Sequence, residues 1–158
     1  MISIDDIADY VAIDPSSRSH LRWIKDYGKR IRSGDPAFNT FSGRLGYFQG
    51  QLAGKKYMAH RVVFFIANGR WPEKFLDHID GNFRNNHPDN LREVTHSQNL
   101  QNMKRAKGFH KTRNGKFRSR IKDSESGRYV DLGLFDNEED AHEAYLKAKR
   151  KLHPFYVE

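Results

Sequence analysis

The longest uninterrupted apolar run in this 158-residue chain is six residues, from Val62 to Ala67. A membrane-spanning helix needs about 20 consecutive apolar residues, so we expect no membrane span. Hydrophobic residues make up 37% of the chain and charged residues 30%, so most of it cannot lie in one deep core, and we expect small folded units. The chain has no cysteine, which excludes disulfides and cysteine-bound zinc as ways to hold these units together.

The formal net charge of the chain is +8. A protein this basic often binds a polyanion, and nucleic acid is the first candidate. A generically basic protein without such a partner is the alternative that charge alone leaves open. The first residues, with Asp5 and Asp6, lack the basic start and the apolar stretch of a signal peptide. We therefore expect a cytoplasmic, intracellular protein, and also a monomer without a small-molecule cofactor.

Three stretches of the chain differ in pattern, and we expect them to be residues 1–56, 57–105 and 106–158. The first is turn-rich, with a weak helical start and short strands, the last two of which form a hairpin over residues 47–58. The second predicts a buried helix over 61–68, strands over 75–79 and 91–94 with a polar loop between them, and a helix from Thr95 towards Arg105. The third predicts strands over 116–122 and 128–135. It also predicts a helix that opens with the acidic turn Asn137-Glu138-Glu139-Asp140 and continues from Ala141 to Leu152, where it ends in basic residues that suit the helix dipole.

The pair Asp77-His78 stands at the end of the strand expected over residues 75–79. Hydrolysis of a phosphodiester needs a base that activates water and a cation that stabilises charge on the phosphate and the leaving oxygen. An aspartate that holds a divalent metal, beside a histidine that faces a water, meets both needs. Asp-His also occurs by chance, so an exposed strand-end pair without chemistry is the alternative, and residues later in the chain must decide between the two.

Two asparagines further along the chain lie where they could belong to the same site as Asp77 and His78. Asn90 lies at the start of the return strand, and Asn99 lies one turn into the next helix. If the strands and the helix fold together, Asn99 faces the Asp77 carboxylate as a second protein ligand. Oxygen ligands from Asp and Asn suit a hard ion such as Mg²⁺ or Mn²⁺ that keeps several waters.

The whole pattern resembles the HNH motif of phage and intron homing endonucleases. The matching segments are Asp77-His78-Ile79-Asp80-Gly81-Asn82, Asn85-Asn86, Asp89-Asn90-Leu91-Arg92 and Thr95-His96-Ser97-Gln98-Asn99, preceded by a similar stretch from Tyr57 to Pro72. The resemblance implies a ββα-metal fold with His78 as general base and Asn90 as the residue that braces the loop and positions it. It also implies Asp77 and Asn99 as ligands of a single divalent metal, and double-stranded DNA as substrate, cut to 5′-phosphate and 3′-hydroxyl ends.

Three further histidines need separate interpretations. His96 lies three residues before Asn99 on the same helical face, so it competes as the metal ligand; we favour Asn99 because its spacing from Asn90 fits the intron-encoded members. We expect His60 to be a packed or helix-capping residue. His87 lies in the polar loop, where we expect it to face solvent or a phosphate.

A run of basic residues without any acid extends from Lys104 to Lys122. Within residues 116–122, strand alternation puts Phe117, Ser119 and Ile121 on one face and the basic residues on the other. On the next strand we expect Val130 and Leu132 to point with the apolar face, and Tyr129 and Asp131 with the basic one. The apolar face needs a cover, which a helical stripe supplies: Ala141, Ala144, Tyr145 and Ala148. The basic face is then free to lie in a DNA groove, and a solvated basic face is the alternative.

This segment resembles the AP2 DNA-binding domain, which recurs at the C-terminus of HNH homing endonucleases. The matching features are Gly108-Phe109, Gly115-Lys116-Phe117, Arg120-Ile121, Val130 to Phe135, Glu139-Asp140-Ala141 and Ala144-Tyr145. The resemblance implies a three-stranded sheet that reads the major groove through His110, Arg113, Arg118, Arg120, Lys122 and Tyr129. The tryptophan common in AP2 strands is absent, and Phe117 and Asp131 take such positions.

We therefore expect an α+β protein with an N-terminal β-rich region, a ββα-metal nuclease core and a C-terminal AP2-like module. Its expected function is that of a site-specific homing or nicking DNA endonuclease from a phage or another mobile element. A non-catalytic, sequence-specific DNA-binding regulator with a decayed nuclease core is the alternative. A second alternative is a basic protein that binds RNA or has a structural role.

Overall fold

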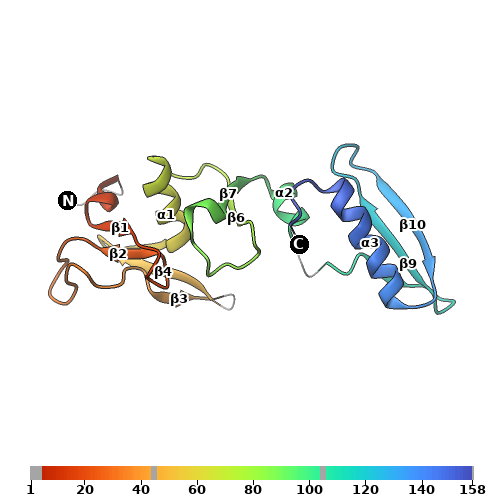
Figure 1. The fold of residues 1–158 in the computed structure, drawn as a ribbon, viewed down its shortest axis with the longest axis horizontal. Helices are drawn as coiled ribbons and strands as arrows, with labels where there is room; N and C mark the ends of the chain where they lie inside the picture. The colour runs from red at the N-terminus through yellow and green to blue at the C-terminus, as the bar shows by residue number, and fades with distance from the viewer. Residues whose placement is uncertain (1–4, 44–45, 104–105, 158) are drawn as a thin grey trace. The chain divides into compact units, whose positions relative to one another are not determined.

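The computed structural model describes residues 5–43, 46–103 and 106–157. It is a mixed α/β structure with several small sheets and few helices, as Figure 1 shows. The chain divides into two compact units, residues 1–95 and 96–158. The expected boundary near residue 56 does not separate compact units, because the N-terminal strands belong to the same unit as the Asp77-His78 strand.

The first unit consists of short elements joined by tight turns. In chain order they are the 3-10 helix η1 (Asp5–Asp9), the strands β1 (Val11–Ile13), β2 (Leu21–Trp23), β3 (Thr40–Ser42), β4 (Tyr47–Leu52) and β5 (Lys55–Met58), the helix α1 (Ala59–Asn68), the strand β6 (Phe75–His78), the 3-10 helix η2 (Pro88–Asn90) and the strand β7 (Leu91–Val94). Strands β1 and β2 pair, β3, β4 and β5 form a three-stranded antiparallel sheet, and β6 pairs with β7.

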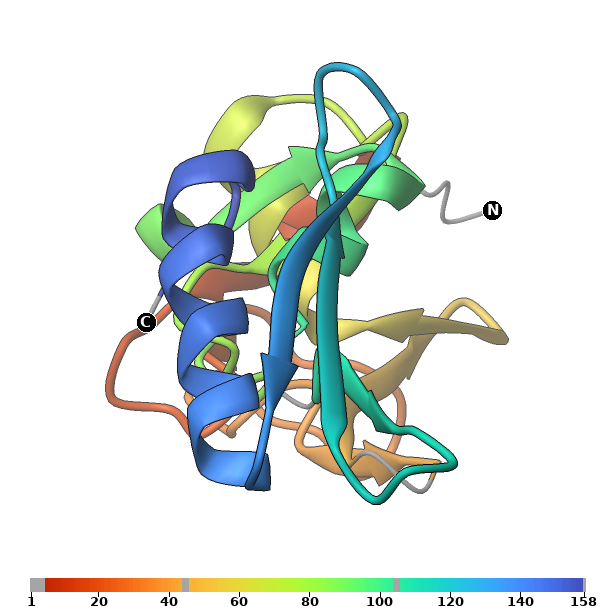
Figure 2. The same ribbon diagram turned by 90° about the vertical axis from the view of Figure 1, so that its right-hand side faces the viewer.

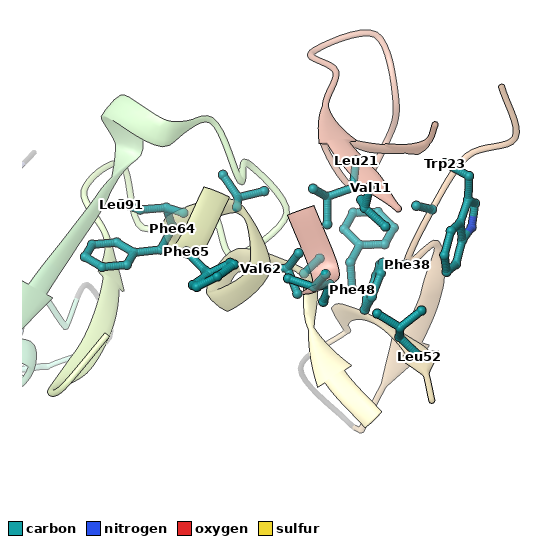
Figure 3. Packing of buried hydrophobic residues seen from close by; sticks show 14 residues of the cluster. Val11, Leu21, Trp23, Phe38, Phe48, Leu52, Val62, Phe64, Phe65 and Leu91 are labelled. Carbon is teal, nitrogen blue, oxygen red and sulfur yellow. The ribbon is translucent and has the colours of Figure 1, made fainter. Parts of the chain in front are cut away.

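One apolar core holds this unit together. Its buried side chains come from the N-terminal strands (Val11, Leu21), from the β3–β4–β5 sheet and its approach (Phe38, Phe48), from α1 and from Leu91 of β7; Figure 3 shows ten of them labelled. Helix α1 begins two residues before the expected start and ends at Gly69, whose φ of 67° is left-handed and whose N–H donates to the Phe65 carbonyl. The N-terminal region is therefore part of the support of the β6–β7 hairpin.

The second unit begins with α2 (His96–Gln101). The sequence predicts a helix running towards Arg105, but α2 ends at Gln101, before the residues 104–105 that lie outside the described part. The chain's last residues bind just beyond this helix: the Phe155 N–H donates to Gln101 Oε1 at 3.4 Å and the Val157 N–H to Asn102 Oδ1 at 3.3 Å. These side chains satisfy backbone donors of the C-terminal tail, and α2 packs with the C-terminal unit.

A three-stranded antiparallel sheet and one long helix make up the rest of this unit. The strands are β8 (Phe109–Lys111), β9 (Phe117–Lys122) and β10 (Tyr129–Phe135), in the order β10-β9-β8, and the helix is α3 (Glu138–Leu152). Figure 2 shows α3 running along β9 and β10. Asn137 caps α3 by accepting the Asp140 N–H at 2.7 Å, so the helix begins at Glu138, within the acidic turn that the sequence predicts as its first.

Helix α3 covers one face of the sheet with Ala141 and Tyr145, both buried. Gly108 has a φ of 73°, and a Cβ there would lie 1.9 Å from the Tyr145 ring, so only glycine fits. Lys149, near the end of α3, is 1% exposed; its Nζ donates to the Met103 carbonyl at 2.8 Å and lies 4.2 Å from the Tyr156 ring centroid. Burial lowers the pKa of Lys149.

Across the described residues, no helix is both long and apolar enough to cross a membrane.

Candidate functional site

Asp77 and His78 end strand β6, where both side chains turn inward and are 8% and 5% exposed. Asp77 pairs across the hairpin with Arg92 of β7. The Arg92 guanidinium donates to Asp77 Oδ2 through Nε at 3.0 Å and Nη2 at 2.8 Å. A buried carboxylate needs such a partner, because an isolated charge is costly in an apolar interior. Asp77 and His78 are therefore buried at the end of β6, not exposed.

His78 is bonded to a buried asparagine whose orientation is fixed from the N-terminal region. Asn86, 1% exposed, donates from Nδ2 to the Ser19 carbonyl at 3.2 Å and places Oδ1 3.0 Å from His78 Nε2. A carbonyl only accepts, so Asn86 must present its amide nitrogen to Ser19 and its oxygen to His78. That oxygen also only accepts, so His78 Nε2 carries the proton, and the lone pair of the neutral ring lies on Nδ1.

Aromatic side chains surround the His78 ring. The His60 ring of α1 lies edge-on with its centroid 5.4 Å away, and the Tyr47 ring of β4 lies at 6.1 Å. Tyr47 also contacts His60 at 5.4 Å and Phe83 of the β6–β7 loop at 5.2 Å. The three segments that carry these residues thereby hold the imidazole from several sides.

This environment keeps both histidines neutral. Burial lowers the pKa of His78, against the hydrogen bond with Asn86 and the carboxylates of Asp80 and Asp77, which act to raise it. Burial, followed by the nearby His78 and Arg61, lowers the pKa of His60 to about 3. A histidine that is neutral at neutral pH can accept a proton, which is what a general base must do.

The loop between β6 and β7 is tied together by Asn90 and Asp80. Asn90 Oδ1 accepts the Asp80 N–H at 3.0 Å, and its Nδ2 donates to Asp80 Oδ1 at 3.0 Å and to the Asn85 carbonyl at 2.7 Å. Burial acts to raise the pKa of Asp80, but hydrogen bonds from Asn85, the Asn82 N–H and Asn90 outweigh it, and the pKa falls. The carboxylate stays ionised and keeps the loop in one conformation.

The donor set of this site fits a hard divalent ion. The Asp77 carboxylate offers hard oxygen atoms beside His78, and a hard ion such as Mg²⁺ takes one or two carboxylates and keeps several waters. Within the described residues, no three His, Asp or Glu side chains form a metal cluster. Asp77 is a carboxylate of the first unit that could hold such an ion beside His78.

The remaining residues of the motif lie in the second unit or at the loop surface. Asn99 is half-buried on α2, and His96 is exposed at the start of α2, where it lines a hollow of about 430 Å³ with Lys122 and His153. His87 is exposed and caps η2, accepting the Asp89 N–H on Nδ1 at 3.3 Å.

The open face of the second unit's sheet carries the predicted DNA-binding residues. Along β9, Phe117, Ser119 and Ile121 are buried beneath α3, whereas Arg118, Arg120 and Lys122 are exposed on the opposite face. His110 of β8 lies opposite Arg118, and Tyr129 of β10 lies opposite Lys122. Arg113 is exposed but lies on the turn between β8 and β9, outside the strands.

Two of these arginines are held by side chains of β10. Arg118 forms an ion pair with Asp131, its Nε donating to Oδ2 at 3.1 Å and its Nη2 bonding to the same oxygen. The hydrogen bond and charge of Asp131 raise the pKa of Arg118 further. Arg120 lies over the Tyr129 ring, 4.8 Å from its centroid. Both guanidiniums are therefore directed by neighbours on the open face.

The sequence assigned no role to four residues of the site, which are Ser19, Tyr47, Asn86 and Arg92. Ser19 acts through its backbone carbonyl, which has no sequence signature, and Tyr47 reaches His78 only through the packing of the first unit. Asn86 and Arg92 lie within the motif segments. The Arg92 position opposite Asp77 follows from hairpin register, so the register of the two strands is the signal that could have found it.

Comparison with known proteins gives one positive result. Residues 57–101 match the family model of the HNH endonucleases, a stretch that includes Asp77, His78, Asn90 and Asn99 and that continues from the first unit into the second. No curated protein and no solved structure matches the chain. The family match supports an HNH nuclease that cleaves DNA.

Proposed function

Starting from an HNH nuclease that acts on DNA, we propose that this protein is a site-specific endonuclease with His78 as its general base. The observation that carries the proposal is the buried His78, placed beside Asp77 within the matched segment and held in one tautomer by Asn86. The Asn90 bonds across the loop support its assignment as the brace that positions His78.

In the proposed reaction, His78 Nδ1 accepts a proton from the water that attacks phosphorus. The new bond joins the water oxygen to phosphorus as the bond from phosphorus to the 3′ oxygen breaks, and the departing oxygen takes a proton from solvent. The products are a 5′-phosphate and a 3′-hydroxyl. Buried Asn86 fixes the ring orientation, and the rings of Tyr47 and His60 pack beside it.

Asp77 and Asn99 would hold one divalent ion, Mg²⁺ or Mn²⁺. Such an ion supplies charge stabilisation for the phosphate and the leaving oxygen. Asp77 offers the carboxylate, and Arg92 fixes the orientation of that carboxylate in the hairpin.

The open face of the β8–β9–β10 sheet would bind the same DNA. Six residues are proposed to make these contacts: His110, Arg113, Arg118, Arg120, Lys122 and Tyr129. The exposed, one-sided placement of the three basic residues of β9 supports this assignment. We further propose an AP2-like role in the major groove, and a phage or mobile element as the biological setting, with one strand cut at each binding event.

The test is DNA cleavage by the purified full-length chain. Plasmids that carry segments of host DNA are incubated with Mg²⁺, with Mn²⁺ and with EDTA. We expect metal-dependent nicks at defined sites. Binding to duplex DNA without any metal-dependent cleavage would instead support the non-catalytic regulator.

The metal ligand on α2 is tested in the same assay. Asn99→Ala should abolish metal-dependent cleavage, whereas His96→Ala should keep most of it. The opposite ranking would move the ligand to His96.

A further inference from the structure

The open face of the β8–β9–β10 sheet carries a large aliphatic side chain, Leu134, beside its charged residues. Leu134 of β10 is 58% exposed. Simple alternation along the strand would place it with Val130 and Leu132 on the side covered by α3. The structure places it on the other side.

The cause is an irregularity in β10. The pairing register with β9 shifts between Asp131 and Gly133, so that Leu132 is an extra residue without a partner in the ladder. Beyond this bulge Leu134 lies opposite Arg118, and side chains of paired residues share a face. Gly133 makes the bulge possible with a φ of 116°, and its N–H donates to Asp131 Oδ1 at 3.1 Å.

The same bulge orients Arg118. Asp131 uses one oxygen for the Gly133 N–H and the other for Arg118 Nε and Nη2. A guanidinium has five N–H groups, so Nη1 and the second hydrogen of Nη2 remain directed outward as a pair. An acid on a DNA-facing surface weakens phosphate binding, so the position of Asp131 favours orientation of Arg118 over non-specific affinity.

We infer that Arg118 and Leu134 together read two neighbouring base pairs in the major groove, Arg118 a guanine and Leu134 the 5-methyl group of a thymine. Arginine bonds guanine O6 and N7 in a bidentate manner, and apolar side chains contact the thymine methyl. Paired residues on adjacent strands have Cβ atoms about 5 Å apart, which is compatible with neighbouring bases about 3.4 Å apart along one DNA strand. This inference rests on the proposed DNA-binding role of the sheet.

The experiment uses the full-length chain and removes the methyl group from the DNA. A preferred duplex is first selected from a random library, and each thymine is then replaced in turn by deoxyuridine, which lacks only that methyl. We expect one position at which the wild-type Kd rises about fourfold, the equivalent of about 0.8 kcal/mol for one buried methyl. Leu134→Ala should bind the thymine and deoxyuridine duplexes equally. Val130→Ala, on the same strand but with the opposite orientation, should keep the fourfold difference.

A second arm tests the guanine. Asp131→Asn should bind random DNA more tightly than the wild type but discriminate less at the base pair next to that thymine. The inference is overturned if no deoxyuridine replacement has an effect that Leu134→Ala removes. Loss of the proposed role of the sheet has a different signature, because the triple variant Arg118→Gln, Arg120→Gln, Lys122→Gln would then bind duplex DNA as tightly as the wild type.

Discussion

The two units of the chain place their functional side chains in opposite surroundings. In the first unit His78 is 5% exposed, and its contacts come from Ser19 through Asn86, from β4 and from α1. In the second unit Arg118, Arg120 and Lys122 are exposed on one strand. The surroundings of His78 come from distant segments of the chain, whereas the basic residues of β9 lie two apart in the sequence.

The difference fits the two tasks that we propose. A general base must be neutral and fixed in one tautomer, which requires burial and hydrogen bonds that only a folded interior provides. Phosphate binding needs positive charge in water, and exposed Lys and Arg provide it at little cost. The role proposed for the first unit therefore depends on packing, whereas the role proposed for the second depends on charge and alternation.

The largest difference between the two units is expected when the proposed general base, His78, is removed. His78→Ala should lower cleavage by about 10²–10⁴-fold, the usual contribution of a general base, while DNA binding stays close to wild type. The measurement is cleavage rate under saturating DNA together with Kd. His87→Asn is the control, since it keeps an acceptor for the Asp89 N–H at the loop surface. Near-normal cleavage by His78→Ala would exclude the assignment.

The next largest effect on the cleavage rate is expected from Asn86, which holds the His78 ring. Asn86→Ala removes the acceptor that holds the proton on His78 Nε2, so we expect a loss of about 10- to 100-fold in cleavage rate, typical of groups that orient a site residue. The Kd for DNA should not change. Asn68→Ala on α1, which loses only a bond to the Phe64 carbonyl, serves as control. If both asparagine variants cleave equally well, the tautomer assignment fails.

If the basic face of β9 binds phosphates, its residues should contribute to the salt dependence of the Kd for DNA. Each of Arg118→Gln, Arg120→Gln and Lys122→Gln that removes a phosphate contact should reduce the slope of log Kd against log salt concentration by about 0.9. The cleavage rate at saturating DNA should remain that of the wild type. Lys29→Gln, an exposed charge in the first unit, is the charge-matched control. Slopes identical to this control in all three variants would place the DNA interface elsewhere.

The smallest effect concerns acid stability of the first unit. The pKa of His60 is about 3 in the folded protein and about 6.5 in an unfolded chain. Between these values the unfolded state binds the proton and the native state does not, so stability falls as pH drops from about 6.5 towards 3. His60→Gln cannot bind that proton and should lose stability less steeply over this range. Urea unfolding at pH 7 and pH 4.5 measures the difference, and equal pH dependence in both proteins contradicts it.

Local patterns in the sequence predict many of the elements but not all of their boundaries. The helix at residues 61–68, the β6–β7 strands and the alternation along β9 follow from apolar periodicity and turn residues. The expected division near residue 56 is not a boundary between compact units, because apolar residues of the N-terminal strands share a core with α1 and Leu91. Periodicity describes which face is apolar, but it does not say which other segment covers that face.

The sequence by itself determined the residue types, their spacing and the charge: an Asp-His pair, asparagines at motif positions and a strand with one basic face. Only the tertiary structure decided that Ser19 orients Asn86, that Tyr47 and His60 enclose His78, and that a bulge turns Leu134 to the open face. The physical reason is distance along the chain. Alternation and turn preferences act over a few residues, whereas burial, hydrogen-bond direction and strand register depend on partners that folding brings together from elsewhere in the chain.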